Sequence, residues 1–527
     1  MNTKARPVLL AMLLIGSLLW LAPPAQAAGD SEDFAAACKA LENADFTGVL
    51  DAPTQLTEAK VVPASGVVPA HCLAKGFVAT HVGIELRLPV VGWNGKFIEV
   101  GCGGHCGVFF TVLCSGPLKK GYACIASDMG HTSLTTQAAW AYNNLQAQID
   151  WGYRAAHVAA LAGKAITAAY YSHAPSRSYF LGCSTGGREA MVETQRFPWD
   201  FDGIVAGAPV INTEGWTMDF IYAIRALAGP DGKPVLSGSD AQMIHDAVVA
   251  KCDMDDGVKD GVISNPMACK FDPAVLACKG PGQGSCLSST QVEAVRKLYA
   301  GPPPAIVNRV YTEGAIPGSE LNWVSDHLSY WSTSHYTADA LRYWGFWPAP
   351  GPKWNLTDFD MERDSKRLSM YGSVANANNP DIRKFAALGH KLIAYFGWQD
   401  PSPPEITDYY ETVEHTMGGR AATQNFFRLF MIPGMDHCTG GAGAFAIDYL
   451  TYMENWVEKG QAPDKLIGSH IDGISWGDAF PLTAMPLDGS QPVKFTRPFY
   501  PYPAYSRYKG KGDPNDAANF VPVMPKK

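Results

Sequence analysis

The sequence predicts an α/β protein built on a mainly parallel sheet. Short apolar runs that end in turn residues recur along the chain, and stretches of helical character separate them. Alternation of this kind places the strands side by side and covers both faces of the sheet with helices. Hydrophobic residues make up 47% of the 527 residues, so the chain can bury a large core.

The expected elements follow from hydrophobic periodicity and from turn residues. The stretch 78–88 alternates well enough for antiparallel strands. The remaining elements, in chain order, are strands within 95–100 and 122–128, a helix over 153–171, a strand at 179–181, a helix over 188–196, strands at 203–208, 391–396 and 427–432, and a helix over 444–459.

The alternation breaks between residues 212 and 378. This segment is rich in proline, glycine and aromatic residues, and it is far longer than an ordinary loop. We therefore expect a second, lid-like domain at 212–378, inserted between two parts of the core at 28–211 and 379–527.

The N-terminus has the three parts of a secretory signal peptide. Lys4 and Arg6 precede an apolar run over 8–22, and Ala25-Gln26-Ala27 is a cleavage site of the A-x-A type. A membrane anchor needs a longer apolar stretch. We expect residues 1–27 to be removed and the mature protein to be secreted or periplasmic.

Charge and cysteine content narrow the class of protein further. The net charge is −8 and no basic patch stands out, so neither nucleic acid nor a membrane surface is an expected partner. In an oxidising compartment, twelve cysteines indicate disulfides rather than metal thiolates. Their spacing fits no paired CxxC zinc pattern, and Cys38 and Cys72 bracket a segment that one disulfide could close.

The most informative stretch is Gly182-Cys183-Ser184-Thr185-Gly186, which lies between a predicted strand and a predicted helix. In that context Gly-x-Ser-x-Gly predicts a nucleophile elbow. The two glycines stand where a Cβ would clash in the sharp turn, and the backbone N–H of Thr185 points to where an oxyanion would form. The alternative is a chance match, since the chain has 52 glycines.

A serine nucleophile needs a base and an acid that orients the base. In α/β-hydrolases the order along the chain is Ser, then Asp or Glu, then His. Asp400 follows the 391–396 strand and His437 follows the 427–432 strand, which are the positions that this topology requires. The sequence thus predicts an α/β-hydrolase fold with a large inserted lid domain.

Other carboxylates compete for the role of the acid. Asp436 is adjacent to His437, and a side chain in that position cannot easily reach the Nδ1 atom of its neighbour. Glu405 and Asp408 are weaker competitors on the same loop as Asp400.

These residues together resemble the Cys-Ser, Asp, His-Cys motif of the tannase and feruloyl esterase family, which includes a bacterial terephthalate monoester hydrolase. The resemblance extends from 93–97 to 507–510 and includes Cys-Ser-x-Gly-Gly-Arg-Glu and Pro-Gly-Met-x-His-Cys. It implies hydrolysis of phenolic or aromatic acid esters, with a lid domain over the site. It also implies an oxyanion hole made by the backbone N–H groups of Gly104 and Thr185.

A second cluster of acidic residues lies in the lid segment, over 252–262. Clustered carboxylates repel one another unless a hard cation neutralises them, and oxygen ligands suit calcium. The segment is not an EF-hand, because the twelfth position from Asp253 is Ser264. The resemblance implies a structural calcium ion; its ligands would be the side chains of Asp253, Asp256 and Asp260 and the carbonyls of Val258 and Val262. The alternative is a solvated acidic turn.

Cys183 and Cys438 are expected to form a disulfide. Each is next to a residue of the Ser184–His437 pair, whose side chains must lie within hydrogen-bonding reach, so the two cysteines can approach closely enough. The lid segment contributes four more disulfide cysteines, Cys252, Cys269, Cys278 and Cys286. The pairing of Cys102, Cys106, Cys114 and Cys124 stays open: two bridges around the glycine-rich loop, or a free thiol.

The lid also contains a dense run of aromatic residues: Trp323, Trp331, Tyr336, Tyr343, Trp344 and Trp347. Most of them are expected to form the core of the lid, while one or two stack on a planar acyl group. Trp344 is a speculative substrate contact, and Arg342 is a speculative partner for a substrate carboxylate.

The sequence therefore predicts a secreted serine esterase that acts on small aromatic esters. His437 deprotonates Ser184, Asp400 orients His437, and an acyl-enzyme forms. A feruloyl, gallate or terephthalate monoester remains possible as the substrate, because the lid contacts that rank them are not visible in the sequence. A non-enzymatic, calcium-stabilised binding protein on the same fold is the alternative from another class. The oligomeric state stays open.

Overall fold

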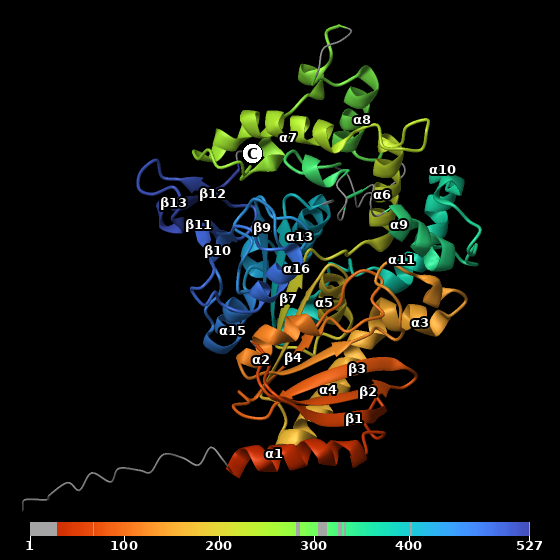
Figure 1. Cartoon of the computed structure of the whole chain (residues 1–527), viewed down its shortest axis with the longest axis vertical. Coiled ribbons are helices and arrows are strands. Elements are labelled where there is room, and N and C mark those ends of the chain that lie inside the picture. The colour runs from red at the N-terminus through yellow and green to blue at the C-terminus, as the bar shows by residue number, and fades with distance from the viewer. Residues whose placement is uncertain are drawn as a thin grey trace, which may run out of the picture.

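A computed structural model describes residues 29–66, 68–280, 285–303, 314–324, 329–330, 334–400 and 403–525. The expected signal peptide at 1–27 and Trp331 lie outside these residues. Figure 1 shows a mixed α/β molecule, with the sheet in its lower and middle part and a group of helices, α6 to α10, above and beside it.

Within the described residues, nine strands form one large sheet. Their order across the sheet is β1 (Thr54–Val62), β2 (His71–Val78), β3 (Val82–Pro89), β5 (Ala123–Ser127), β4 (Lys96–Val100), β6 (Arg177–Cys183), β7 (Gly203–Gly207), β8 (Lys391–Gly397) and β9 (Phe427–Ile432). The strands from β1 to β5 in this order pair antiparallel, and the six strands from β5 to β9 pair parallel. The parallel sheet that the sequence predicts is therefore confirmed.

Helices cover both faces of the parallel strands, because these strands are apolar on both sides: every residue of β5 and β7 is buried. A Cβ on Gly163 of α4 (Ala155–Tyr171) would contact the ring of Phe97 on β4. Tyr179 of β6 pairs next to Phe97 but faces the other way, and its hydroxyl donates to Glu458 of α15 (Tyr449–Lys459) at 2.6 Å. Thus α4 and α15 lie on opposite faces.

Several boundaries differ from the sequence-based prediction. The stretch 78–88 holds the end of β2, a turn and β3, while β1 and most of β2 were not predicted; the outer faces of β1 are exposed and polar, which weakens its hydrophobic pattern. The helix expected over 444–459 begins only at Tyr449. The preceding apolar run is extended instead, and Ala446 exchanges backbone hydrogen bonds with Ser469.

Two small sheets near the C-terminus were also not predicted. They are β10 (Leu466–Ile471) with β11 (Val493–Phe499), and β12 (Tyr505–Tyr508) with β13 (Phe520–Val523). The remaining α-helices are α1 (Gly29–Ala40), α2 (Ser115–Lys119), α3 (Leu145–Ile149), α5 (Thr185–Arg196), α6 (Thr213–Leu227), α7 (Gly238–Cys252), α8 (Ser289–Ala300), α9 (Ser334–Ala340), α10 (Met361–Ser365), α11 (Ser369–Ala375), α12 (Arg383–Ala387), α13 (Pro404–Thr416), α14 (Arg420–Thr423) and α16 (Trp476–Ala479).

The segment from α6 to α11 has two hydrophobic clusters of its own, although Ala340, Trp344 and Tyr371 belong to the cluster of the sheet. One lies among α6, α7 and α8 and includes Leu227, Ile244 and Trp323. A second, smaller cluster includes Ile221 and Phe346. The sheet and its helices share one much larger cluster.

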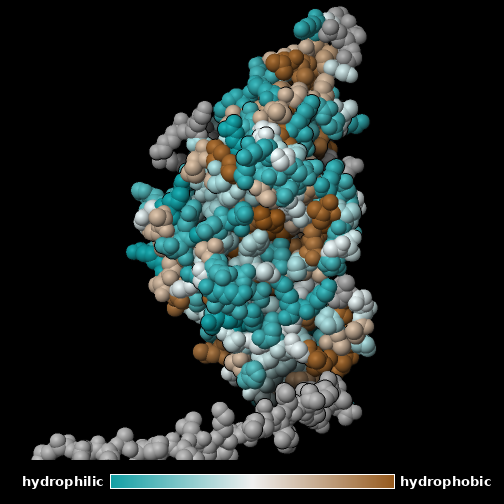
Figure 2. Space-filling view, turned by 90° about the vertical axis from the view of Figure 1, so that its left-hand side faces the viewer, coloured by the Kyte–Doolittle hydropathy of each residue, from teal (hydrophilic) through white to brown (hydrophobic). Residues whose placement is uncertain are grey.

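The surface drawn in Figure 2 is mainly hydrophilic, with a few separate hydrophobic patches. In the described part of the chain, none of the helices is both long enough and apolar enough to span a membrane.

Candidate active site

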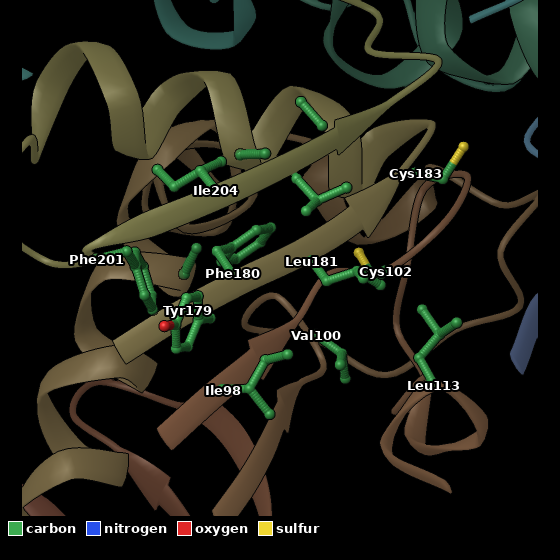
Figure 3. Packing of buried hydrophobic residues seen from close by; sticks show 14 of the residues in the cluster. Ile98, Val100, Cys102, Leu113, Tyr179, Phe180, Leu181, Cys183, Phe201 and Ile204 are labelled. Carbon is green, nitrogen blue, oxygen red and sulfur yellow. The ribbon is translucent and has the colours of Figure 1, made fainter. Parts of the chain in front are cut away.

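Ser184 stands at the turn between β6 and α5, with a backbone φ of 63° and ψ of −120°. A non-glycine residue rarely adopts this conformation, and here close packing enforces it. A Cβ on Gly182 would lie 2.5 Å from the carbonyl oxygen of Gly186, and one on Gly187 would lie 2.1 Å from that of Gly207. Figure 3 shows the buried side chains of β6 beneath this turn, with Cys183 at the end of the strand.

The glycine-rich loop after β4 packs against the turn at Ser184. The backbone N–H of Gly186 donates to the carbonyl of Cys102 at 2.7 Å, and the Thr185 hydroxyl donates to the carbonyl of Gly104, also at 2.7 Å. Gly104 has a φ of +60°, and a Cβ there would lie 2.4 Å from the Thr135 carbonyl oxygen. Glycine is therefore required at the position where an oxyanion donor was expected.

His437 and Asp400 meet at the carboxyl ends of β9 and β8. The Nδ1 atom of His437 lies 2.7 Å from Oδ2 of Asp400, and the Asp400 side chain is only 4% exposed. Burial alone disfavours the imidazolium, but the Asp400 carboxylate outweighs it and raises the pKa of His437. A hydrogen bond at Nδ1 leaves Nε2 as the proton acceptor of the neutral ring.

The competing carboxylates have other partners. Glu405 accepts a hydrogen bond from the backbone N–H of Asn212 at the start of α6. Asp436 accepts one from the Asn322 side chain at 2.9 Å. Asp400 is thus the carboxylate that the structure places on His437.

A disulfide joins Cys183 to Cys438, with an S–S distance of 2.04 Å and a Cα–Cα distance of 5.8 Å, as expected. It ties the strand that ends at Ser184 to the loop that carries His437. The structure also answers the open question of pairing, because it describes every cysteine and none is free. The other pairs are Cys38–Cys72, Cys102–Cys106, Cys114–Cys124, Cys252–Cys269 and Cys278–Cys286.

Ser184, Asp400 and His437 line one cavity of about 420 Å³. The predicted oxyanion residues Gly104 and Thr185 line it as well. Much of its wall is aromatic, and both the sheet-forming parts and the 212–378 segment contribute: Phe110, Trp151, Trp216, Phe220, Tyr336, Tyr371, Trp476 and Phe480. A cavity of this size and polarity suits a planar apolar group.

The two speculative substrate residues lie elsewhere. Arg342 donates from Nε to the Trp354 carbonyl at 2.7 Å and does not line the cavity. Trp344 is buried behind the cavity wall, where its ring packs edge-on against Trp151 at 4.9 Å and Tyr371 at 4.3 Å. Both were predicted because they stand in an aromatic run. The prediction is wrong because the short helices point these two side chains away from the cavity.

Of the lid aromatics, Tyr336 reaches the cavity and stacks on His105, with ring centroids 3.9 Å apart. Trp323 is in the core of its own segment, but the expectation that most of the run forms this core is wrong: Trp344 belongs to the cluster of the sheet and Trp347 is 53% exposed. The prediction missed the aromatic residues outside the run, above all Trp151, which sits on a π-helical turn, and Trp476. In the sequence, only the large aromatic side chains of these two residues could have suggested a role in the cavity wall.

Arg188 was noted only as part of a motif, yet it is a permanent cation at the cavity. Its guanidinium lies over the Trp151 ring, 3.9 Å from the centroid, and it donates to the carbonyls of Trp151, Gly152 and Ala375. It is 1% exposed, and burial lowers its pKa to about 10, so it stays charged at neutral pH. Its position directly after the two glycines of the elbow is the sequence feature that could have predicted its place at the cavity.

The acidic loop predicted to bind calcium is compact and partly buried. Asp253 accepts from the backbone N–H groups of Asp260 and Gly261 at 3.2 Å, and Asp256 accepts from the Ser264 hydroxyl at 2.6 Å. Burial raises the pKa of Asp253 and raises that of Asp256 to about 6. Asp260 differs, because it forms an ion pair with Arg497 of β11 at 2.6 Å.

Known proteins that are similar to this chain over most of its length are esterases, in agreement with the geometry of the site. A family model described as "Tannase and feruloyl esterase" matches residues 66–523. An uncharacterized esterase of Xanthomonas campestris pv. campestris is 30% identical, over 98% of this chain and 95% of that protein. A mono(2-hydroxyethyl) terephthalate hydrolase of Piscinibacter sakaiensis is 31% identical, over 93% of this chain and 92% of that one.

Among solved structures, feruloyl esterase B from Aspergillus oryzae is similar with a TM-score of 0.80 and 26% identity, over 93% of this chain and all of that one. The non-enzymatic alternative therefore has no support. The chain belongs to the tannase and feruloyl esterase family, and it is a carboxylic ester hydrolase.

Proposed function

We propose that the protein is an exported serine esterase that hydrolyses esters of aromatic acids through an acyl-enzyme. The observation that carries this proposal is the His437–Asp400 hydrogen bond at the same aromatic-walled cavity as Ser184. The nucleophile, its base and the group that orients the base come from three strand ends at one edge of the sheet.

Each of these residues has a distinct part in the reaction. Neutral His437 takes the proton of the Ser184 hydroxyl through Nε2 as the oxygen attacks the ester carbonyl. The backbone N–H groups of Thr185 and Gly104 stabilise the oxyanion that develops there. His437 then protonates the leaving alcohol, and the same cycle with water releases the acid. Asp400 keeps the imidazole in the correct tautomer and stabilises its charged form.

The order of the strands supports an α/β-hydrolase fold. The serine follows β6, the acid follows β8 and the histidine follows β9, in the chain order typical of that fold. The separate clusters of α6 to α11 support a lid domain over 212–378. Trp216, Phe220 and Tyr336 from this segment line the cavity, so the lid forms part of the substrate pocket.

The charge distribution favours an uncharged acyl group, such as a feruloyl group, over one with a carboxylate. Among the described lining residues, Arg188 is the only Lys or Arg side chain, and three backbone carbonyls already engage its guanidinium. Arg342 is turned to the Trp354 carbonyl. A substrate carboxylate in this cavity would meet mainly aromatic rings and threonines. Arg188 is 1% exposed and turned to backbone carbonyls, so it would pair poorly with that charge.

We also propose a structural calcium ion in the loop of Asp253, Asp256 and Asp260. Two of the three carboxylates, Asp253 and Asp256, are buried and form no direct ion pair among the described residues, which is costly unless a cation is bound. Hard oxygen donors of this kind fit calcium, with the Val258 and Val262 carbonyls as further ligands. The ion would brace the loop and takes no part in the chemistry at Ser184.

Export is supported by the cysteines. The structure places twelve of them in six disulfides, which persist only in an oxidising compartment. The predicted signal peptide agrees with this, and we propose a secreted or periplasmic protein.

Methyl ferulate, methyl gallate and a terephthalate monoester should be compared as substrates of the wild type and of Ser184→Ala. We expect turnover of methyl ferulate with the highest kcat/KM, and no turnover by the variant. Preference for the terephthalate monoester would contradict the charge argument. Equal turnover by Ser184→Ala would contradict the proposed mechanism.

A further inference from the structure

We propose that Asn322, a residue of the 212–378 segment, positions the catalytic base and its acid by hydrogen-bonding to both of their loops. This inference rests on the proposed roles of Asp400 and His437. It makes the alignment of these two side chains dependent on the lid, which sequence patterns assign only to substrate selection.

The contact consists of two hydrogen bonds from one amide group. The Nδ2 atom of Asn322 donates to the carbonyl oxygen of Gln399 and to Oδ1 of Asp436, each at 2.9 Å. Gln399 immediately precedes Asp400, and Asp436 immediately precedes His437. The amide of Asn322 is thus one residue away from both members of the base–acid pair.

The chemistry of the acceptors fixes the orientation of the amide. A backbone carbonyl and a carboxylate can only accept hydrogen bonds, so the NH₂ group and not the carbonyl of Asn322 must face them. An NH₂ group has two hydrogens, and here each has one acceptor. An isosteric aspartate has no donor to offer and would bring a second negative charge to Asp436.

The lid presents Asn322 from a firmly held turn. Asn322 ends the 3₁₀ turn Glu320–Asn322, and its backbone N–H bonds the Ser319 carbonyl at 2.9 Å. The buried Glu320 carboxylate accepts from the Tyr299 hydroxyl and the Gly318 N–H, both at 2.7 Å. The next residue, Trp323, is 1% exposed in the lid cluster. The position of Asn322 therefore follows that of the lid core.

The two loops that receive the amide are also joined directly. The backbone N–H groups of Trp398 and Gln399 donate to the carbonyls of Ile432 and Met435 at 3.0 and 3.1 Å, and the Asp400–His437 hydrogen bond connects their ends. Asn322 adds a link from outside the sheet. Displacements of about 1 Å in a catalytic group can cost on the order of a hundredfold in rate, so a link at this place affects kcat more than substrate binding.

The experiment compares Asn322→Asp, Asn322→Ala and Ser319→Ala in the full-length protein. The aspartate keeps the size of the side chain but loses both donors. Ser319→Ala is the matched control: its hydroxyl bonds the Ile316 carbonyl and the Trp323 indole within the same lid segment and touches neither loop. Steady-state kinetics with methyl ferulate and a melting temperature are measured for each variant.

We expect Asn322→Asp to lower kcat by about tenfold or more with KM changed less than about twofold. Asn322→Ala should lose less than the aspartate, because it adds no repulsion. Ser319→Ala should melt at a lower temperature but keep a kcat close to that of the wild type.

Two results would overturn the inference. One is an Asn322→Asp variant with wild-type kcat, which would show that only the size of the side chain matters. The other is an equal loss of kcat in Ser319→Ala, which would make the effect one of general lid stability. Ser184→Ala tests the proposed function separately: if it is inactive while Asn322→Asp is fully active, only the role of Asn322 fails.

Discussion

The sheet-forming part of the molecule and the inserted segment 212–378 are built in different ways. In the former, nine strands and their helices share one large hydrophobic cluster, and the ends of three parallel strands deliver Ser184, Asp400 and His437 to one edge. In the latter, helices enclose two smaller clusters. Two local disulfides, Cys252–Cys269 and Cys278–Cys286, hold this segment together.

This difference shows how firmly each region holds its side chains in place. Ser184 and Asp400 follow strands with a neighbour on each side, so the sheet sets their place, while His437 follows the edge strand β9 and is tied to the sheet by the Cys183–Cys438 disulfide. Small cores bury less apolar area per residue, so local disulfides contribute more to their stability. We therefore expect the sheet to supply the reacting groups, and we propose that the insertion contributes substrate selectivity and the alignment of these groups.

The largest effect is expected at the sheet edge. Ser184→Ala and His437→Ala should each lower ester turnover by about 10⁴-fold or more, and Asp400→Asn somewhat less, because the triad acts as a unit. Circular dichroism and melting curves should match the wild type. Retention of activity in Asp400→Asn together with its loss in a Glu405 or Asp408 variant would contradict our choice of the acid.

The next largest effect is expected from removal of the disulfide that joins the end of β6 to the His437 loop. The Cys183–Cys438 disulfide spans 255 residues, and loop-closure entropy alone would stabilise the folded state by at most about 4–5 kcal/mol. The double variant Cys183→Ala, Cys438→Ala should lose activity at lower urea concentrations than those that unfold it, because the His437 loop is released first. Cys278→Ala, Cys286→Ala, which opens a local bridge, is the control. Coincident loss of activity and fold would argue against this.

Removal of the proposed calcium ion should lower the stability of the insertion and of its contact with β11, without a direct effect on the chemistry at Ser184. At an ion concentration a hundred times the Kd, binding stabilises the folded state by about 2.7 kcal/mol, so chelation should lower the melting temperature by a few degrees. Asp253→Ala should remove this response, while kcat at low temperature stays unchanged. Loss of turnover in a chelated sample that is still folded would instead indicate a catalytic metal.

The smallest expected effect is a change in the pKa of the catalytic base, His437. His437 must be neutral to act, so activity rises with pH through its pKa, which Asp400 and, to a smaller extent, Asp436 hold above the usual 6.5. Asp436→Asn keeps an acceptor for Asn322 but removes a negative charge, so the acid limb of kcat/KM should move to lower pH by less than about one unit. A shift to higher pH would contradict the sign of this interaction.

Much of the site could be read from the chain because it depends on local rules. Gly182 and Gly186 are required by a turn with no room for a Cβ, and this requirement is visible as a sequence motif. Asp400 and His437 follow strands that are mainly apolar, and parallel topology brings such strand ends together. The partners of Cys183 and Cys438 followed from the same neighbourhood.

Other features were decided only by tertiary structure. Arg342 and Trp344 stand in a suitable aromatic run, but the short helices turn one to the Trp354 carbonyl and bury the other behind the cavity. The helix expected from residue 444 starts at Tyr449, because the run before it bonds to Ser469 instead. Asn322 lies 114 residues from Asp436, and no local pattern signals their contact. Turns and strand ends follow from short-range sterics, whereas the partner of a polar side chain depends on how separate segments pack.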